Sequence, residues 1–186
     1  MYKEIRLAGT GGQGLILAGL ILAEAAGIYD GYNVIQTQSY GPEARGGASK
    51  TEVIISSMPI DYPKVTLPDI LLIMSQQSWD KYASWVKPET IILVDKSNVT
   101  SMSIFERPMI VSLPITEMAK DKVGKGVVAN VVALGVLVGV TGVVTHLSME
   151  KAILSRVPRG TERLNMDAFG VGLKSVKGVR AFYEIT

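Results

Sequence analysis

The sequence contains no cysteine and only one histidine, His146. Without cysteine the chain can form no disulfide, offers no thiolate nucleophile and cannot hold an iron–sulfur cluster through thiolates. A metal site needs several ligating side chains, so a single histidine after an apolar segment indicates a structural role. These two shortages predict that the chain itself carries no metal.

Charge is also scarce, because Asp, Glu, Lys and Arg together make up 19% of the residues against a typical ~25%. The 19 basic and 17 acidic side chains give a net charge of +2, which is too weak to indicate binding to nucleic acid or to an anionic membrane. A surface with few charges has more apolar area, which favours contact with partner proteins. The length of 186 residues suits one domain, which we expect to span residues 1–186.

Neither a leader nor a membrane span is predicted. The first residues follow a strand-like pattern and lack the apolar run that a signal peptide needs, so we expect a cytoplasmic protein. The segment 127–144 is long enough to reach the lower limit of a membrane span, and Gly135 and Gly139 match the small-xxx-small pattern of paired membrane helices. Lysines precede this segment, however, and no aromatic belt accompanies it. We therefore expect a helix buried in the core or in an interface.

Strand-like and helix-like segments alternate along the chain. We expect strands at 3–8, 33–38, 51–56, 70–74, 91–95 and 109–113, and helices at 15–29, 76–86, 127–144, 149–157 and 161–174. Ser148 is the expected N-cap of the helix at 149–157. The strands are continuous apolar runs, which is typical of strands covered by helices on both faces. The pattern predicts a three-layer α/β fold with a mostly parallel, Rossmann-like sheet and a helical C-terminal part.

A glycine-rich loop, Gly9-Thr10-Gly11-Gly12-Gln13-Gly14, separates the first strand from the first helix. This is the context in which a G-x-G-x-x-G motif binds a phosphate or another anion at the helix N-terminus. The alternative is that the glycines only allow close packing of helix and strand. A dinucleotide site is disfavoured, because the second strand ends in Gln36-Thr37-Gln38, without the acidic residue that binds ribose hydroxyls.

A second unusual loop follows the second strand and reads Tyr40-Gly41-Pro42-Glu43-Ala44-Arg45-Gly46-Gly47. In a parallel sheet it emerges at the carboxyl edge, beside the glycine-rich loop, where ligands bind in α/β folds. The guanidinium of Arg45 is suited to bidentate binding of a carboxylate or phosphate. Alternatively, Glu43 and Arg45 pair with each other and brace the loop.

Taken together and in this order, the two loops resemble those of the gamma subunit of 2-oxoacid:ferredoxin oxidoreductases. In that family a GxGGQG turn is followed by a YGPExRGG-like loop, a strand, a short proline-bearing connection and later a helix with an Asn near its start. The matching segments here are Gly9 to Gly14, Tyr40 to Gly47, Thr51 to Ser57, Pro59 to Pro63, and Asn130. The stretch from Thr37 to Lys50 is most similar to the 2-oxoglutarate branch, with the pyruvate and branched-chain branches as alternatives.

The resemblance implies an enzyme that oxidatively decarboxylates a 2-oxoacid, forms an acyl-coenzyme A and reduces ferredoxin. Thiamine diphosphate, Mg²⁺ and the iron–sulfur clusters are then expected in partner chains, namely alpha and beta subunits and a ferredoxin-like delta subunit or domain. This chain would carry no catalytic residue, would be inactive alone and would form part of the coenzyme A or substrate channel or of a subunit interface.

The residues that the resemblance assigns to that channel or interface belong to the two loops and the later helix. They are Gly9, Gly11, Gly12, Gln13, Gly14, Tyr40, Gly41, Pro42, Glu43, Arg45, Gly46, Gly47 and Asn130. For Asn130 in its apolar helix, we expect a hydrogen bond to a buried backbone group rather than to ligand.

Two other functions fit the residues. A free-standing Rossmann-like module that binds a nucleotide or a coenzyme A ester would bind its ligand alone, as a monomer or a homodimer. An independent NAD(P) dehydrogenase would bind its cofactor alone, and the missing acidic residue counts against it.

Overall fold

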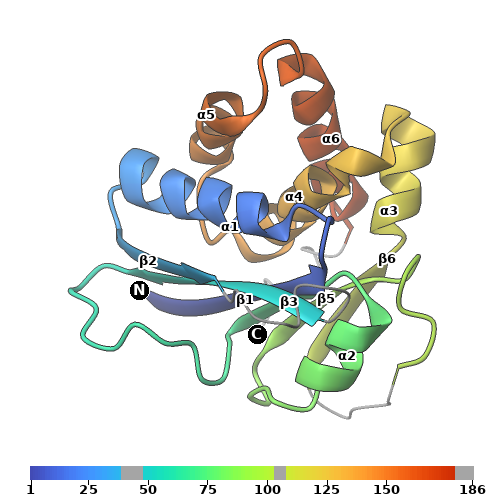
Figure 1. Cartoon of the computed structure of the whole chain (residues 1–186). Helices are drawn as coiled ribbons and strands as arrows, with labels where there is room; N and C mark the ends of the chain where they lie inside the picture. The colour runs from blue at the N-terminus through green and yellow to red at the C-terminus, as the bar shows by residue number, and fades with distance from the viewer. Residues whose placement is uncertain (39–47, 103–107, 179–186) are drawn as a thin grey trace.

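The computed structural model describes residues 1–38, 48–102 and 108–178. They form a six-stranded sheet in the order β2-β3-β1-β4-β5-β6 (Figure 1). The strands are β1 (Tyr2–Thr10), β2 (Asn33–Gln38), β3 (Ala48–Ser56), β4 (Ile70–Ile73), β5 (Ile91–Asp95) and β6 (Met109–Leu113). Strands β1, β4, β5 and β6 are parallel, whereas β3 runs antiparallel to both β1 and β2. The predicted α/β fold with a mostly parallel sheet is confirmed.

Strand β3 is the departure from a Rossmann arrangement. It lies between β1 and β2, so the unit β1–α1–β2 does not place its two parallel strands side by side. It also begins at Ala48, three residues before the predicted start at Thr51, because its ladder with β1 extends as far as the pair Thr10 and Ala48. The alternation of apolar residues gave no sign of this reversed direction.

Helices cover the two faces of the sheet unequally (Figure 1). One face carries α1 (Leu15–Glu24), α4 (Ala129–Thr141), α5 (His146–Arg156) and α6 (Glu162–Ser175), and α2 (Gln76–Tyr82) covers the other. The first helix continues in a π-helical turn, η1 (Ala25–Tyr29). The short α3 (Ile115–Met118) continues in a second π-helical turn, η3 (Ala119–Val123), and a 3₁₀ turn, η4 (Gly126–Val128), leads into α4. The helical C-terminal part is therefore confirmed.

One apolar cluster lies on each side of the sheet. Ile5, Leu7 and Leu72 point toward α1 and α4 in the larger cluster, whereas Ala8 and Leu71 point toward α2 in the smaller one. The alternation along β1 and β4 thus sends successive side chains into different cores. This arrangement explains why the strands are continuous apolar runs, and it confirms the three layers.

Helix α4 lies at the centre of the larger cluster, with every side chain from Ala129 to Gly139 buried. It packs closely on α6 because glycines face each other. A Cβ on Gly135 would lie 2.3 Å from the carbonyl oxygen of Phe169, and a Cβ on Gly172 would lie 2.1 Å from that of Val132. The glycine pattern therefore serves helix packing in the protein core. In the ranges described, no helix is long and apolar enough to cross a membrane.

Two local predictions were wrong. The N-cap of α5 is Thr145, whose hydroxyl accepts a hydrogen bond from the Ser148 N–H, and α5 begins at His146. Ser148 instead donates its hydroxyl hydrogen to Asp30 at 2.6 Å, and Thr145, three residues earlier, is the N-cap in its place. Helix α2 ends at Tyr82 rather than at 86.

Candidate functional site

The glycine-rich loop is held in shape by the side chain of Gln13. Its Oε1 accepts a hydrogen bond from the Thr10 N–H, and its Nε2 donates to the carbonyl of Met74 at the end of β4, both at 2.8 Å. A Cβ on Gly9 would lie 2.2 Å from Gln13 Oε1 and 2.6 Å from Leu15 Cδ1. A side chain at Gly9 would therefore displace the side chains of Gln13 and Leu15, and Gln13 fixes the loop to the neighbouring strand.

Asn130 joins the glycine-rich loop to α4. Its Nδ2 donates to the carbonyl of Gly14 at 3.1 Å, and its Oδ1 accepts from the Val131 N–H at 3.0 Å. Gly14 is the N-cap of α1 and has a φ of 71°, and a Cβ there would lie 2.6 Å from Asn130 Nδ2. Asn130 is buried. The expected hydrogen bond from this asparagine to a backbone group is present, but its acceptor belongs to Gly14, which is an exposed residue rather than a buried one.

The outer part of the loop is open to solvent. Gly11 and Gly12 are exposed, and Gly12 has a φ of 88° with nothing within 4 Å of the place where a Cβ would lie. Helix α1 begins behind them with no side-chain cap and no acidic residue in its first turn. The positive end of the helix dipole is thus not neutralised from within α1, an arrangement that favours an anion.

Two clusters that the sequence did not reveal hold the neighbouring strand ends in place. Ser78, the third residue of α2, donates its hydroxyl to the carbonyl of Gly9 at 3.1 Å. Asp95 is fully buried at the end of β5 and accepts hydrogen bonds from the hydroxyl and N–H of Thr116 and from Asn98 Nδ2. Its oxygens are engaged within the protein, so Asp95 braces the edge rather than offering a carboxylate to a ligand. The only signal in the sequence was an acidic residue at the end of a buried strand.

The second loop falls outside the described residues. Its predicted site residues are Tyr40, Gly41, Pro42, Glu43, Arg45, Gly46 and Gly47. What the structure describes is where the flanking strands end. Ala48 opens β3 opposite Thr10, the residue where the glycine-rich loop starts, and Gln38 ends β2 opposite Thr51 of β3. Proximity of the two loops remains a prediction.

No metal site emerges from the described ranges, in which no group of three or more His, Cys, Asp or Glu side chains is placed to hold an ion. At the carboxyl edge of the sheet, the described residues therefore present backbone N–H groups on a rigid loop. They do not present a group of side chains suited to acid–base catalysis or metal binding. Such a rigid loop can orient an anionic group.

Comparison with known proteins identifies the family. The model of the pyruvate ferredoxin/flavodoxin oxidoreductase family matches residues 4–175. The 2-oxoglutarate synthase subunit KorC of Methanocaldococcus jannaschii is 51% identical over 178 residues, which cover 95% of each chain. The ketoisovalerate oxidoreductase subunit VorA of Methanothermobacter marburgensis is 38% identical over 76% of this chain and 30% of its own length.

A solved structure supports the same assignment. The gamma subunit of a keto/oxoacid ferredoxin oxidoreductase from Geobacter sulfurreducens has a TM-score of 0.85 and 48% sequence identity, covering 95% of this chain and 99% of its own. The chain described here therefore belongs to the pyruvate ferredoxin/flavodoxin oxidoreductase family and matches its gamma subunit over nearly the whole length.

Proposed function

We propose that this chain is the gamma subunit of a 2-oxoglutarate:ferredoxin oxidoreductase. The complex would convert 2-oxoglutarate, coenzyme A and oxidised ferredoxin to succinyl-CoA, CO₂ and reduced ferredoxin. The observation that carries the substrate assignment is the 51% identity to a 2-oxoglutarate synthase subunit across 95% of both chains, compared with 38% to the ketoisovalerate subunit over a shorter match. The pyruvate and branched-chain versions of the subunit are the alternatives that a substrate panel tests.

The chemistry itself would reside in partner subunits. The sequence has no cysteine, so the iron–sulfur clusters that carry electrons need a ferredoxin-like delta subunit or domain. Thiamine diphosphate and Mg²⁺ would be held by the alpha and beta subunits, and ferredoxin would receive the electrons from the assembled complex in the cytoplasm. The gamma subunit would be inactive alone.

The gamma subunit would contribute one wall of the coenzyme A or substrate channel. Gln13 and Asn130 hold the glycine-rich loop rigid from two sides, while Gly11 and Gly12 leave its outer surface free of side chains. A phosphate or carboxylate could therefore approach the backbone N–H groups directly. Arg45, in the loop that leads into Ala48, would add a charged, bidentate partner to the same anion.

The first experiment tests the subunit assignment. The chain is recovered from its native cell under anaerobic conditions, and the eluate is assayed for viologen reduction that depends on both 2-oxoglutarate and coenzyme A. Alpha, beta and delta partners together with this activity are the expected result. A monomer or homodimer that binds a nucleotide or a coenzyme A ester alone would favour the free-standing module instead.

The second experiment tests the channel in the assembled complex. We expect Arg45→Ala to raise the KM for coenzyme A or for the 2-oxoacid about tenfold or more, because charge-assisted hydrogen bonds contribute about 1.5–3 kcal/mol. The matched control is Arg159→Ala, which removes the same charge from an exposed position between α5 and α6. Unchanged KM values in a complex that assembles normally would show that Arg45 does not line the channel.

A further inference from the structure

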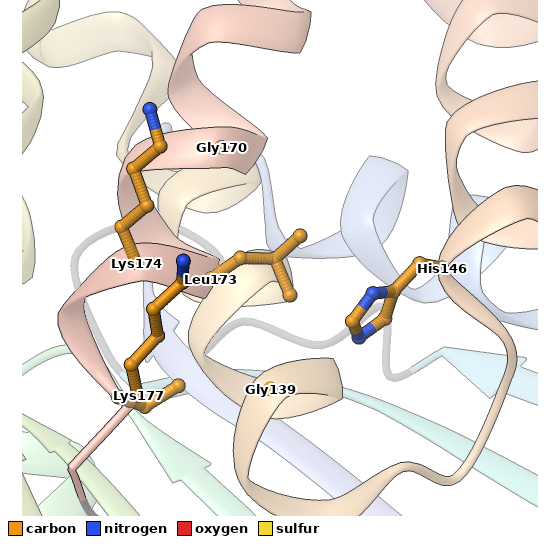
Figure 2. Close-up of a pocket in the computed structure, with 7 residues that line it drawn as sticks. Gly139, His146, Gly170, Leu173, Lys174 and Lys177 are labelled. Carbon is orange, nitrogen blue, oxygen red and sulfur yellow. The ribbon is translucent and has the colours of Figure 1, made fainter.

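A hollow of about 380 Å³ lies between the C-terminal parts of α4 and α6 and the start of α5. Its size is at the lower end of the range for small-molecule sites, about 300–1,000 Å³. The residues that line it are Gly139, His146, Gly170, Leu173, Lys174, Val176 and Lys177. Figure 2 shows His146 and Leu173 pointing toward each other from opposite sides.

The hollow is separate from the glycine-rich loop. Asn130, which contacts that loop, and Gly139, which lines the hollow, are nine residues apart on α4, so about 14 Å of helix separates them. An open helix surface contributes to the hollow, because a Cβ on Gly170 would meet nothing within 4 Å. The space in front of α6 is therefore available to a ligand.

The side chains that line the hollow among the described residues include two lysines and a histidine. Lys174, Lys177 and His146 line it, and no acidic side chain in the described ranges does. Within the described ranges, none of these three side chains takes part in a hydrogen bond or an ion pair. The lysines lie at the end of α6, where cations complement the helix dipole, whereas His146 lies on a different helix, at the start of α5. Helix stabilisation therefore does not account for the whole set.

We propose that this hollow binds a small organic anion, a carboxylate or phosphate joined to a short apolar chain. Leu173, which is only partly buried, would pack against the chain beside Gly139 and Gly170, while Lys174, Lys177 and the imidazole N–H of His146 would bind the head group. Lys174 lies in the last turn of α6 and Lys177 lies two residues beyond the end of the helix, both at the edge of the hollow (Figure 2). Their flexible stems can bring the ammonium groups to the ligand. This site does not depend on the function proposed above.

The test uses the full chain and hexanoate as the probe. Because His146 is the only histidine, its ring proton signals in an NMR spectrum report on the hollow without further assignment. We expect hexanoate to shift them saturably with a Kd of about 1 mM, a reasonable affinity for a ligand of this size. Hexan-1-ol, which has the same chain without the charge, should bind about tenfold more weakly. Inorganic phosphate alone should also bind more weakly, because it lacks the apolar chain.

Two variants, each with a matched control, sharpen the test. Lys174→Gln combined with Lys177→Gln should weaken hexanoate about tenfold, whereas the control Lys64→Gln, in the connection between β3 and β4, should leave the affinity unchanged. Gly170→Leu should fill the hollow and abolish the binding of hexanoate. Gly170→Ala should fold at least as well as the parent protein and should still bind hexanoate. The proposal is overturned if His146 shows no saturable shift up to about 20-fold above the expected Kd. Full hexanoate affinity in Gly170→Leu, or phosphate binding as tight as that of hexanoate, would overturn it as well.

Discussion

The two faces of the sheet are built by different means. On the face of α1, α4, α5 and α6, the strands send almost only apolar side chains into the larger cluster, and the helices approach closely through glycines. On the other face, at the β3 side, Arg6 and Glu52 are buried next to the connection between β3 and β4. The face covered by α1, α4, α5 and α6 is stabilised by close packing and apolar burial, whereas the other face also contains a buried ion pair.

The buried charges form one connected group. Arg6 Nε lies 2.7 Å from Glu52 Oε1, which also lies 2.8 Å from Lys50 Nζ. The Arg6 guanidinium donates to the carbonyl of Val65 at 3.1 Å and lies 5.3 Å from the centre of the Tyr82 ring. The arginine therefore ties the connecting segment and α2 to the sheet. Removing Arg6 leaves the buried carboxylate of Glu52 with Lys50 as its remaining partner, whereas an apolar face responds mainly to changes in volume.

The largest effect is expected on the apolar face, from Gly172→Ala. The new Cβ would lie 2.1 Å from the carbonyl oxygen of Val132 and 2.9 Å from the Cα of Gly135. Since both atoms belong to the backbone of α4, the two helices must separate. We expect the free energy of unfolding to fall by about 3 kcal/mol or more, at or above the upper end of the usual overpacking cost. Urea denaturation measures the change.

The matched control is Gly170→Ala, two residues earlier on the same helix. Nothing lies within 4 Å of its new Cβ, so the helix propensity of alanine should raise the stability by about 0.5–1 kcal/mol. If both substitutions changed the stability equally, close packing between α4 and α6 would not be what stabilises this face.

The second-largest loss of stability is expected from Arg6→Met, on the face with the buried ion pair. The substitution preserves much of the apolar stem but leaves Glu52 with Lys50 alone and removes the hydrogen bond to the Val65 carbonyl. We expect a loss of about 2–3 kcal/mol in urea denaturation, somewhat less than for a buried pair with no third member. The double variant Arg6→Met/Glu52→Leu should lose less stability than Arg6→Met, because it no longer buries a carboxylate whose only ionic partner is Lys50.

A surface pair provides the control for this prediction. Arg163 and Asp167 lie 3.9 Å apart on α6 with both side chains largely exposed, so Arg163→Met should change the stability by less than about 0.5 kcal/mol. A double variant at Arg6 and Glu52 that is less stable than Arg6→Met would contradict the view that the two charges are coupled.

The same difference between the faces explains what the sequence could predict. Every strand and most helices were placed correctly, because apolar periodicity is local and the larger cluster imposes it directly. The reversed direction of β3 was missed, because it depends on pairing with β1, where Arg6 is the partner of Glu52, and no local pattern in the sequence encodes that pairing. The cap of α5 was missed for a related reason. Thr145 and Ser148 both suit an N-cap, and the hydroxyls of both donate to Asp30, a residue far away in sequence.

For the candidate site too, the sequence predicted local features but not contacts between distant segments. The G-x-G-x-x-G spacing located the loop, and a buried asparagine in an apolar helix predicted a backbone partner, which is Gly14. The spacing could not reveal that Gln13 reaches the carbonyl of Met74 or that Ser78 reaches that of Gly9. These bonds join segments more than sixty residues apart, and only the three-dimensional arrangement brings them together.

The smallest expected effect is on the pH dependence of stability, which we compare for one buried glutamate on each face of the sheet. Burial acts to raise the pKa of Glu24, but hydrogen bonds from Ser155 and Arg156 and the charge of Arg156 outweigh it, so the pKa of this carboxyl is lowered. Burial raises the pKa of Glu4, with a further contribution from Asp69, and the charge of Lys87 offsets this only in part. Linkage then predicts opposite effects of the two carboxylates on stability.

Ionised Glu24 stabilises the fold above its ordinary pKa of 4.5, and this contribution is lost as the pH falls through the lowered folded value. Glu24→Gln should therefore be about 1 kcal/mol less stable than the parent at pH 7, and the difference should shrink in acid. Ionised Glu4 destabilises the fold once the pH rises through its raised folded pKa. Glu4→Gln, which keeps an oxygen acceptor, should match or exceed the parent at pH 7 and lose that advantage below 4.5. Thermal unfolding of the three proteins from pH 3 to 8 tests both, and parallel pH profiles for the two variants would refute the contrast.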